Sequence, residues 1–133
     1  MPVRHAVLMK PRVPTALADA LAVVARDLRA THPDFTVVFD RDQHGSWWVA
    51  LANNGTFQLH GSDFSADDEP GPDLLAAVAD AAQEVILELH FVVWPTCPDH
   101  NLGLHAAVNH GRAVWTCSAG GTHVRAAIGD GVA

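Results

Sequence analysis

The sequence feature that most constrains the fold is the placement of the chain's two cysteines. Cys97 is followed by His100 and Cys117 by His123, so these residues have the spacing C-x2-H-x16-C-x5-H. Thiolates and imidazoles are the ligands that tetrahedral zinc prefers. The spacing therefore predicts a zinc clip that joins two turns of the C-terminal part, with His105 or a water competing with His123 for the fourth position.

Other states of the two cysteines stay open at this point. Cys97 and Cys117 could form a disulfide, which a reducing compartment disfavours, or they could be buried free thiols. A catalytic metal would need an open coordination position and a nearby base. The sequence contains neither the H-x-E with P-C-x-x-C signature of zinc deaminases nor H-E-x-x-H. The sequence therefore favours a structural metal over a catalytic one.

Size and charge limit the class of protein. The 133 residues, 49% of them hydrophobic, suit one globular domain or one domain with a small appendage. There is no apolar run of about 18 residues and no secretion signal pattern, so we expect a cytoplasmic protein that does not span a membrane. The net charge is −7 and Lys10 is the only lysine. This balance argues against nucleic acid and anionic membranes as partners.

Hydrophobic periodicity predicts a helix and then a meander in the first half of the chain. The helix begins with Thr15 as its cap, carries apolar residues at three- and four-residue spacing, and ends at His32-Pro33. Alternating apolar residues predict strands at 35–39, 47–51 and 57–59. Asn54-Gly55 predicts a tight turn between the last two strands. We expect an antiparallel three-stranded sheet.

A second helix and a short β-rich tail follow an acidic loop. The loop, residues 61–73, lacks the bidentate glutamate of a calcium loop and is interpreted as a solvated linker. Asp73 is expected to cap a helix that runs to about Val93. Strands are expected at 104–108, 113–116 and 123–128. The predicted fold is α+β, with an α-β-β-β-α layer in residues 1–93 and a zinc-clipped β-knuckle in residues 94–133.

The same tail carries a resemblance to a known family. The segment Trp94-Pro-Thr-Cys97-Pro-Asp-His100, then Trp115-Thr-Cys117 and the Ile128-Gly ending resemble a family of small uncharacterised bacterial proteins. That family's tail runs W-P-x-C-P-x-H-x-H-P-L, then W-x-C-P, then I-G, and the resemblance covers about residues 80–130. It implies a helix that leads into a zinc-ribbon-like knuckle, and no activity. This chain departs from the pattern at Leu102, which replaces the second histidine, and at Ser118, which replaces the proline.

The function follows less directly from the residues. Trp47 and Trp48 are adjacent on a predicted strand, so their side chains point to opposite faces, and one of them is a candidate partner-binding residue. We expect a non-enzymatic protein-binding or adaptor module with a structural zinc. A zinc-dependent hydrolase with an open site and a subunit of a larger assembly are the alternatives, and a homo-oligomer stays open.

Overall fold

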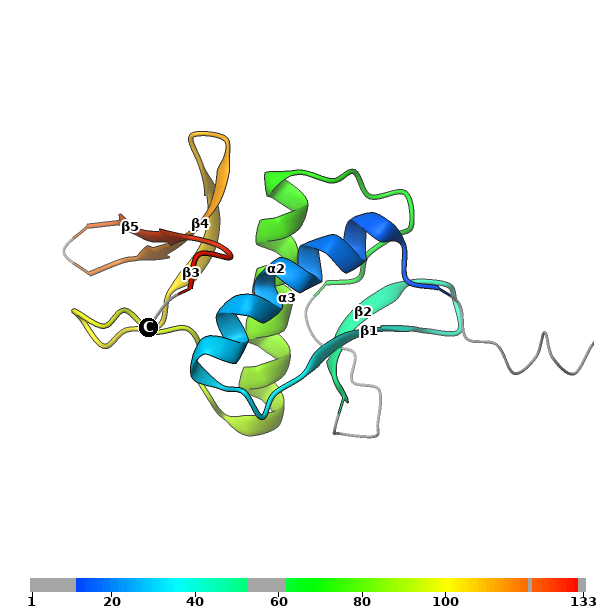
Figure 1. Cartoon of the computed structure of the whole chain (residues 1–133), viewed down its shortest axis with the longest axis horizontal. Helices are drawn as coiled ribbons and strands as arrows, with labels where there is room; N and C mark the ends of the chain where they lie inside the picture. Colours follow the sequence, from blue (N-terminus) through cyan, green and yellow to red (C-terminus); the bar gives the residue numbers. More distant parts are fainter. Residues whose placement is uncertain (1–11, 53–61, 120, 132–133) are drawn as a thin grey trace, which may run out of the picture.

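The computed structural model describes residues 12–52, 62–119 and 121–131. Its described part has two helices, a two-stranded antiparallel hairpin and a three-stranded antiparallel sheet (Figure 1). This confirms the α+β class. The elements are α2 (Thr15–Thr31), β1 (Val37–Arg41), β2 (Trp47–Leu51), α3 (Pro72–His90), β3 (His105–Asn109), β4 (Arg112–Cys117) and β5 (His123–Ala127).

Helix α2 forms where the sequence predicts it, but its first turn is different. Pro14 occupies the cap position and no side chain caps the helix, so the prediction that Thr15 is the cap is wrong. Pro14 has no side-chain acceptor, and its C=O accepts the first helical bond from the backbone N–H of Ala18 at 2.9 Å. The helix ends at Thr31, where the backbone N–H of His32 donates to the C=O of Leu28.

The β1–β2 hairpin is the described part of the predicted meander. Val37 pairs with Leu51 and Arg41 with Trp47. The expected third strand at 57–59 and the Asn54-Gly55 turn lie outside the described residues. Phe64 forms an antiparallel bridge with Trp47, in which the two residues exchange backbone hydrogen bonds of 2.7 and 2.8 Å. A single residue of the acidic loop therefore covers the outer edge of β2 at this point.

Helix α3 begins one residue before its predicted cap and ends before its predicted limit. Gly71 is the cap residue and Pro72 is the first helical residue, so Asp73 lies in the first turn and not at the cap. The helix stops at His90 and not near Val93, because Phe91 adopts the left-handed conformation, with φ 56°. A left-handed residue at this position is a common way to end a helix.

The three strands that the sequence predicts in the tail are present, and they form one sheet with the order β3-β4-β5. His110 and Gly111 form the β3–β4 turn with positive φ at both positions. Strands β4 and β5 pair with a register shift between Trp115 and Thr116. The central strand β4 is buried from Ala113 to Cys117, and its Ala113, Trp115 and Cys117 belong to the hydrophobic core of the molecule, so the sheet is not only a surface flap.

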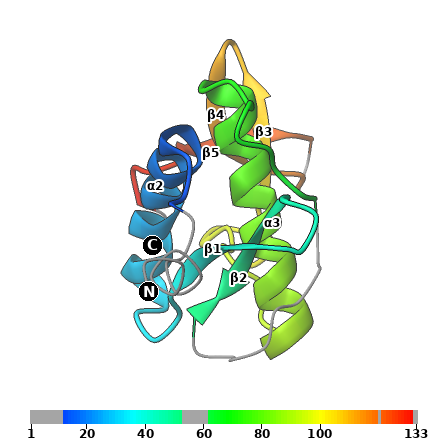
Figure 2. The same ribbon diagram turned by 90° about the vertical axis from the view of Figure 1, so that its right-hand side faces the viewer.

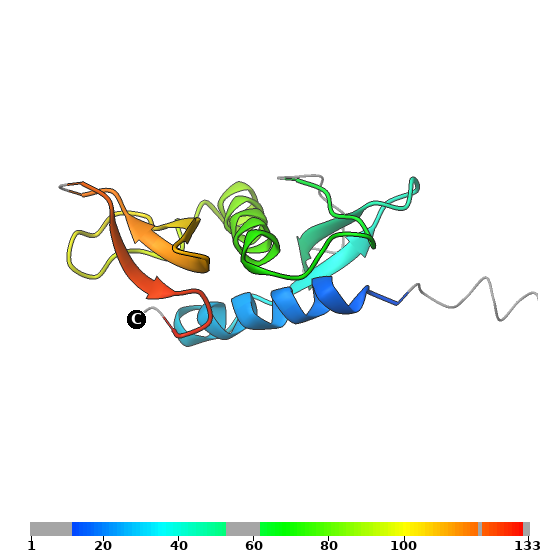
Figure 3. The ribbon, with the colours of Figure 1, turned by 90° about the horizontal axis from the view of Figure 1, so that it is seen from above.

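Helix α3 is the centre of the molecule. It contacts β2 on one side and β3 and β4 on the other, and Figure 3 shows it between the two sheets, with α2 crossing below. Figure 2 shows the same arrangement from the side, with the two helices packed against each other. Buried residues from both helices and both sheets, including Leu17, Val49, Ile86 and Trp115, form one hydrophobic cluster. Within the described ranges, no helix is long and apolar enough to cross a membrane.

Candidate metal site

A short loop after α3 holds the first two candidate ligands. The backbone N–H of Cys97 donates to the C=O of Leu102 at 2.7 Å, and the N–H of Asn101 donates to the C=O of Cys97 at 2.8 Å. Thr96 and Gly103 form an antiparallel bridge just outside this loop. These contacts fix residues 97–102 as a closed knuckle. Cys97 is buried at its base and His100 is exposed at its rim.

The other two candidates face each other across the β4–β5 connection. Cys117 is the last residue of β4, His123 is the first of β5, and the two are paired in register. One ligand atom from each of Cys97, His100, Cys117 and His123 lies within 4.8 Å of all the others. The structure therefore brings together the four residues that the spacing selects.

The distances suit a tetrahedral ion. The Nδ1 atom of His100 lies 3.4 Å from Sγ of Cys97 and 3.5 Å from Sγ of Cys117. Zinc–sulfur bonds of ~2.3 Å and zinc–nitrogen bonds of ~2.0–2.1 Å at tetrahedral angles separate neighbouring ligand atoms by roughly 3.3–3.8 Å. The His100 and His123 rings are 5.3 Å apart between centroids, with an interplanar angle of 62°. All four ligand atoms lie within 4.8 Å of one another, close enough to bind one metal ion.

The electrostatics of the knuckle favour a thiolate. Burial raises the pKa of the Cys97 thiol, but other contacts outweigh it: the hydrogen bond with His100, the backbone N–H groups of Asp99 and His100, and the Cys117 thiol. Together they lower this pKa from 9.0 to about 6. Both cysteines are free, so the disulfide alternative is not the state of this structure. A buried thiolate is the form that binds a metal.

The remaining predicted site residues lie elsewhere. His105 is exposed at the start of β3 and does not belong to the group of four. Trp47 is 5% exposed and packs in the core, with the Arg41 guanidinium 6.0 Å from its ring centroid. Trp48 is half-buried, and its Nε1 donates to Oδ2 of Asp42 at 2.8 Å. The two tryptophans do point to opposite faces, but neither presents an open aromatic surface.

Two residues that the sequence analysis missed hold the tail in place. Gln83 of α3 donates from Nε2 to the C=O of Trp94 at 3.0 Å and to the C=O of Leu104 at 2.7 Å, so it ties both ends of the knuckle to the helix. Asp27 of α2 is fully buried, and its carboxylate accepts bonds from Trp115 and from the chain after β5. The sequence carried a signal for both residues. Asp27 and Gln83 recur at the three- and four-residue spacing of the buried side chains of their helices, and a polar side chain in such a position needs a hydrogen-bond partner.

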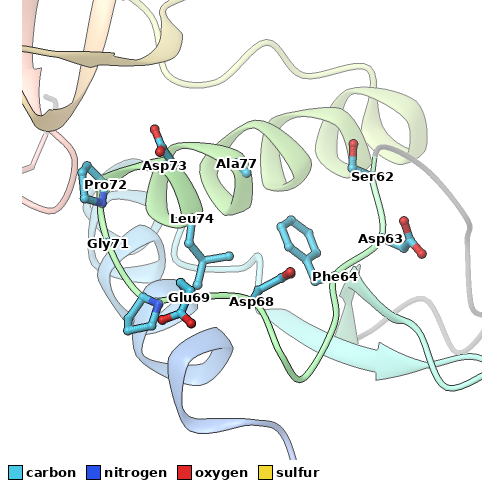
Figure 4. Close-up of a pocket in the computed structure, with 11 residues that line it drawn as sticks. Ser62, Asp63, Phe64, Asp68, Glu69, Gly71, Pro72, Asp73, Leu74 and Ala77 are labelled. Atoms are coloured by element: carbon cyan, nitrogen blue, oxygen red, sulfur yellow. The ribbon is translucent and has the colours of Figure 1, made fainter.

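The acidic loop forms a separate hollow of about 480 Å³ at the start of α3 (Figure 4). Carboxylates of Asp63, Asp68, Glu69 and Asp73 line it together with Phe64. Asp68 Oδ2 accepts the backbone N–H of Ser65 at 2.9 Å, so this carboxylate stabilises the loop itself. Among the residues that the structure describes, none of these acids belongs to a group that could hold a metal ion.

Comparisons with protein-family models, with curated proteins and with solved structures find no match to this chain. The resemblance of residues 80–130 to a bacterial family therefore stays a prediction. The description of the site depends on the geometry of its own residues.

Proposed function

We propose that this protein is a small binding module whose C-terminal part is held together by a structural zinc ion. One observation carries the proposal: two cysteines and two histidines from two separate turns have ligand atoms within 4.8 Å of one another. A metal that links the two turns between Trp94 and Ile128 would add to the stability that the buried side chains of this segment supply.

The donor set favours zinc over other ions. Calcium and magnesium prefer oxygen ligands, and this group has none. Two thiolates neutralise the charge of a divalent ion, while two neutral imidazoles complete a tetrahedron. A neutral site is the least costly one to bury, and both Cys97 and Cys117 are fully buried.

The first experiment is metal content together with the ligand shell. Protein purified without chelator should contain about one zinc per chain, and absorption at the zinc edge should fit two sulfurs and two nitrogens. His123→Ala should weaken zinc binding at least about tenfold in competition with a chromophoric chelator. His105→Ala, a matched exposed histidine, should leave it unchanged. Less than about 0.3 zinc per chain would refute the proposal, because a closed structural site retains its metal.

A second candidate is a zinc-dependent hydrolase with an open metal position. The exposure of His100 favours it, since solvent reaches the imidazole side of the site. The same absorption measurement separates the two candidates. Three protein ligands with an exchangeable water oxygen would favour the hydrolase, whereas four protein ligands leave no position for a reacting water.

The binding role itself is supported by exposed apolar side chains beside the knuckle, which neither the core nor the site uses. The subunit of a larger assembly is the remaining alternative, and light scattering of the purified protein tests for self-association. A reducing compartment such as the cytoplasm would keep both thiols available for the metal.

A further inference from the structure

Apolar side chains gather around the end of α3. Leu87, Phe91, Val93 and Leu102 are 43, 87, 55 and 45% exposed. Leu87 and Phe91 are one helical turn apart, and the N–H of Phe91 donates to the C=O of Leu87. A Cβ atom on Gly103 would lie 2.7 Å from Cγ1 of Val93, so Val93 packs on the chain beside Leu102. We call these four residues the α3-end patch; it lies where α3 turns into the knuckle (Figure 1).

Phe91 is the least expected of the four. It has φ 56° directly after the last residue of α3. Glycine or asparagine adopts this conformation with little or no strain, whereas a residue with a large side chain does so at a cost. The ring is also 87% exposed, so core packing gives nothing in return. A strained residue with an exposed aromatic ring points to a contact made outside the chain.

Carboxylates flank the patch on the helix. Asp80, Glu84 and Glu88 follow one another at four-residue spacing, and residues three or four apart are neighbours on a helix surface. Glu84 therefore lies beside Leu87, and Glu88 beside Phe91. Like charges at this spacing destabilise a helix, and a cationic ligand would reverse that effect.

The charge of the surrounding chain has the same sign. No lysine or arginine occurs between Arg41 and Arg112, and α3 lies entirely within this interval. The carboxylates of the interval are those of Asp42, Asp63, Asp67, Asp68, Glu69, Asp73, Asp80, Glu84, Glu88 and Asp99. Asp63, Asp68, Glu69 and Asp73 lie at the start of α3, whereas Glu84 and Glu88 lie in its C-terminal half, next to the patch. A partner whose charge complements these two glutamates must be basic.

We propose that the α3-end patch, with Glu84 and Glu88 beside it, docks a segment of a partner protein in which aliphatic or aromatic side chains are interspersed with Lys and Arg. This inference rests on the binding role proposed above. The apolar side chains of the segment cover Leu87 and Phe91, and its cations pair with the two glutamates. A second copy of this chain would bring the same carboxylates face to face, and an anionic membrane would repel them.

The test selects ligands without assuming one. The zinc-loaded, full-length protein is used to enrich a random phage-displayed peptide library, and the enriched peptides are synthesised for fluorescence anisotropy. Phe91→Asn removes the ring and keeps a residue that tolerates the left-handed conformation, so it should fold at least as well as the parent. Val108→Thr is its control, since Val108 is 42% exposed on β3, outside the patch. For charge, Glu84→Gln with Glu88→Gln is compared with Glu69→Gln.

The expected peptides contain basic and apolar residues together. Phe91→Asn should weaken their binding at least about tenfold, while Val108→Thr has no effect. The double glutamine variant should weaken binding by about three- to tenfold and reduce its salt dependence, while Glu69→Gln does neither. Enrichment of peptides without basic residues, no enrichment at all, or full binding by Phe91→Asn would overturn the proposal.

Other occupants give different results. Self-association that Phe91→Asn abolishes would assign the patch to a second copy, and Phe91-dependent binding to vesicles of anionic phospholipid would assign it to a membrane. Either outcome overturns the proposed partner. Zinc content is measured on every variant, because the patch and the metal site can fail separately. Peptide binding without zinc would leave the docking surface standing and remove the metal proposal.

Discussion

Replacement of the buried carboxylate of Asp27 should strongly destabilise the protein. Asp27 is 0% exposed. Its Oδ2 accepts the indole N–H of Trp115 at 2.8 Å and the backbone N–H of Gly129 at 2.8 Å, and its Oδ1 accepts the N–H of Gly131 at 2.7 Å. This one side chain joins the first helix to the central strand of the tail and to the chain after β5.

The magnitude follows from what each donor loses in Asp27→Ala. A hydrogen bond to a charged group stabilises by ~1.5–3 kcal/mol. Gly129 and Gly131 are not buried, so water can replace the carboxylate there. Trp115 is 0% exposed, and its N–H would stay unsatisfied at a cost of ~1–3 kcal/mol. Relief of the buried charge offsets part of the loss. We expect a net loss of about 3 kcal/mol, equivalent to a fall in Tm of roughly 10 °C for a chain of this size.

The assay is urea unfolding of zinc-loaded protein followed by tryptophan fluorescence, with Asp19→Ala as the control. Asp19 is an exposed carboxylate on the same helix, and its replacement should change the unfolding free energy by less than about 0.5 kcal/mol. The slope of the transition should stay the same for both variants. A loss for Asp27→Ala no larger than that for Asp19→Ala would refute the reasoning, because the three hydrogen bonds would then carry no net stability.

Three further predictions concern a thiol, a glycine and a turn. The pKa of Cys97 in the metal-free protein is lowered from 9.0 to about 6, so its thiolate stabilises the fold above pH 9 and this contribution is lost as the pH falls through about 6. Thermal unfolding of reduced, metal-free protein should show that loss, and Cys97→Ser should abolish it. Gly129 has φ +104°, and an alanine Cβ there would lie 2.6 Å from a side-chain carbon of α2, so Gly129→Ala should lower the free energy of unfolding in urea by about 2–4 kcal/mol. Gly111 has φ +76° and open space around it, so Gly111→Ala should lower it by about half as much. The hydrogen bond from Trp48 holds the pKa of Asp42 below 3.8, so the contribution of the Asp42 carboxylate to stability is present above that pH and is lost on acidification. The NMR resonance of the Trp48 indole N–H should shift below pH 3.8, and Asp42→Asn should remove this titration.

Local sequence patterns predict the parts of this fold that local physics decides. The apolar phase of α2 and α3 and the three tail strands follow from spacings within one element. Both predicted caps, Thr15 and Asp73, lie inside the helices, because Pro14 and Gly71 occupy the cap positions and Pro72 suits the first helical position.

The contacts that join distant segments could not be predicted in the same way. The bond between Asp27 and Trp115 spans 88 residues, and no local pattern specifies which buried donor an aspartate will meet. The position of α3 between two sheets could not be predicted either, because it also depends on contacts between segments that are distant in the sequence. Its stripe indicates that it is buried, but not that β2 contacts one side and β3 and β4 the other.

Strand β5 is held at both ends by different chemistry, and this separates the two sources of stability in the tail. His123 starts the strand at the candidate metal site, and Gly129, just past its end, donates to Asp27. The two sets of contacts share no side chain, so their contributions to the unfolding free energy should be additive. Loss of the proposed metal would remove one link between the knuckle and the start of β5, while the backbone bonds of the knuckle and the bond from the Trp115 indole to Asp27 would remain. We therefore expect the proposed metal to stabilise the knuckle and the start of β5, and the buried carboxylate to hold the sheet on α2.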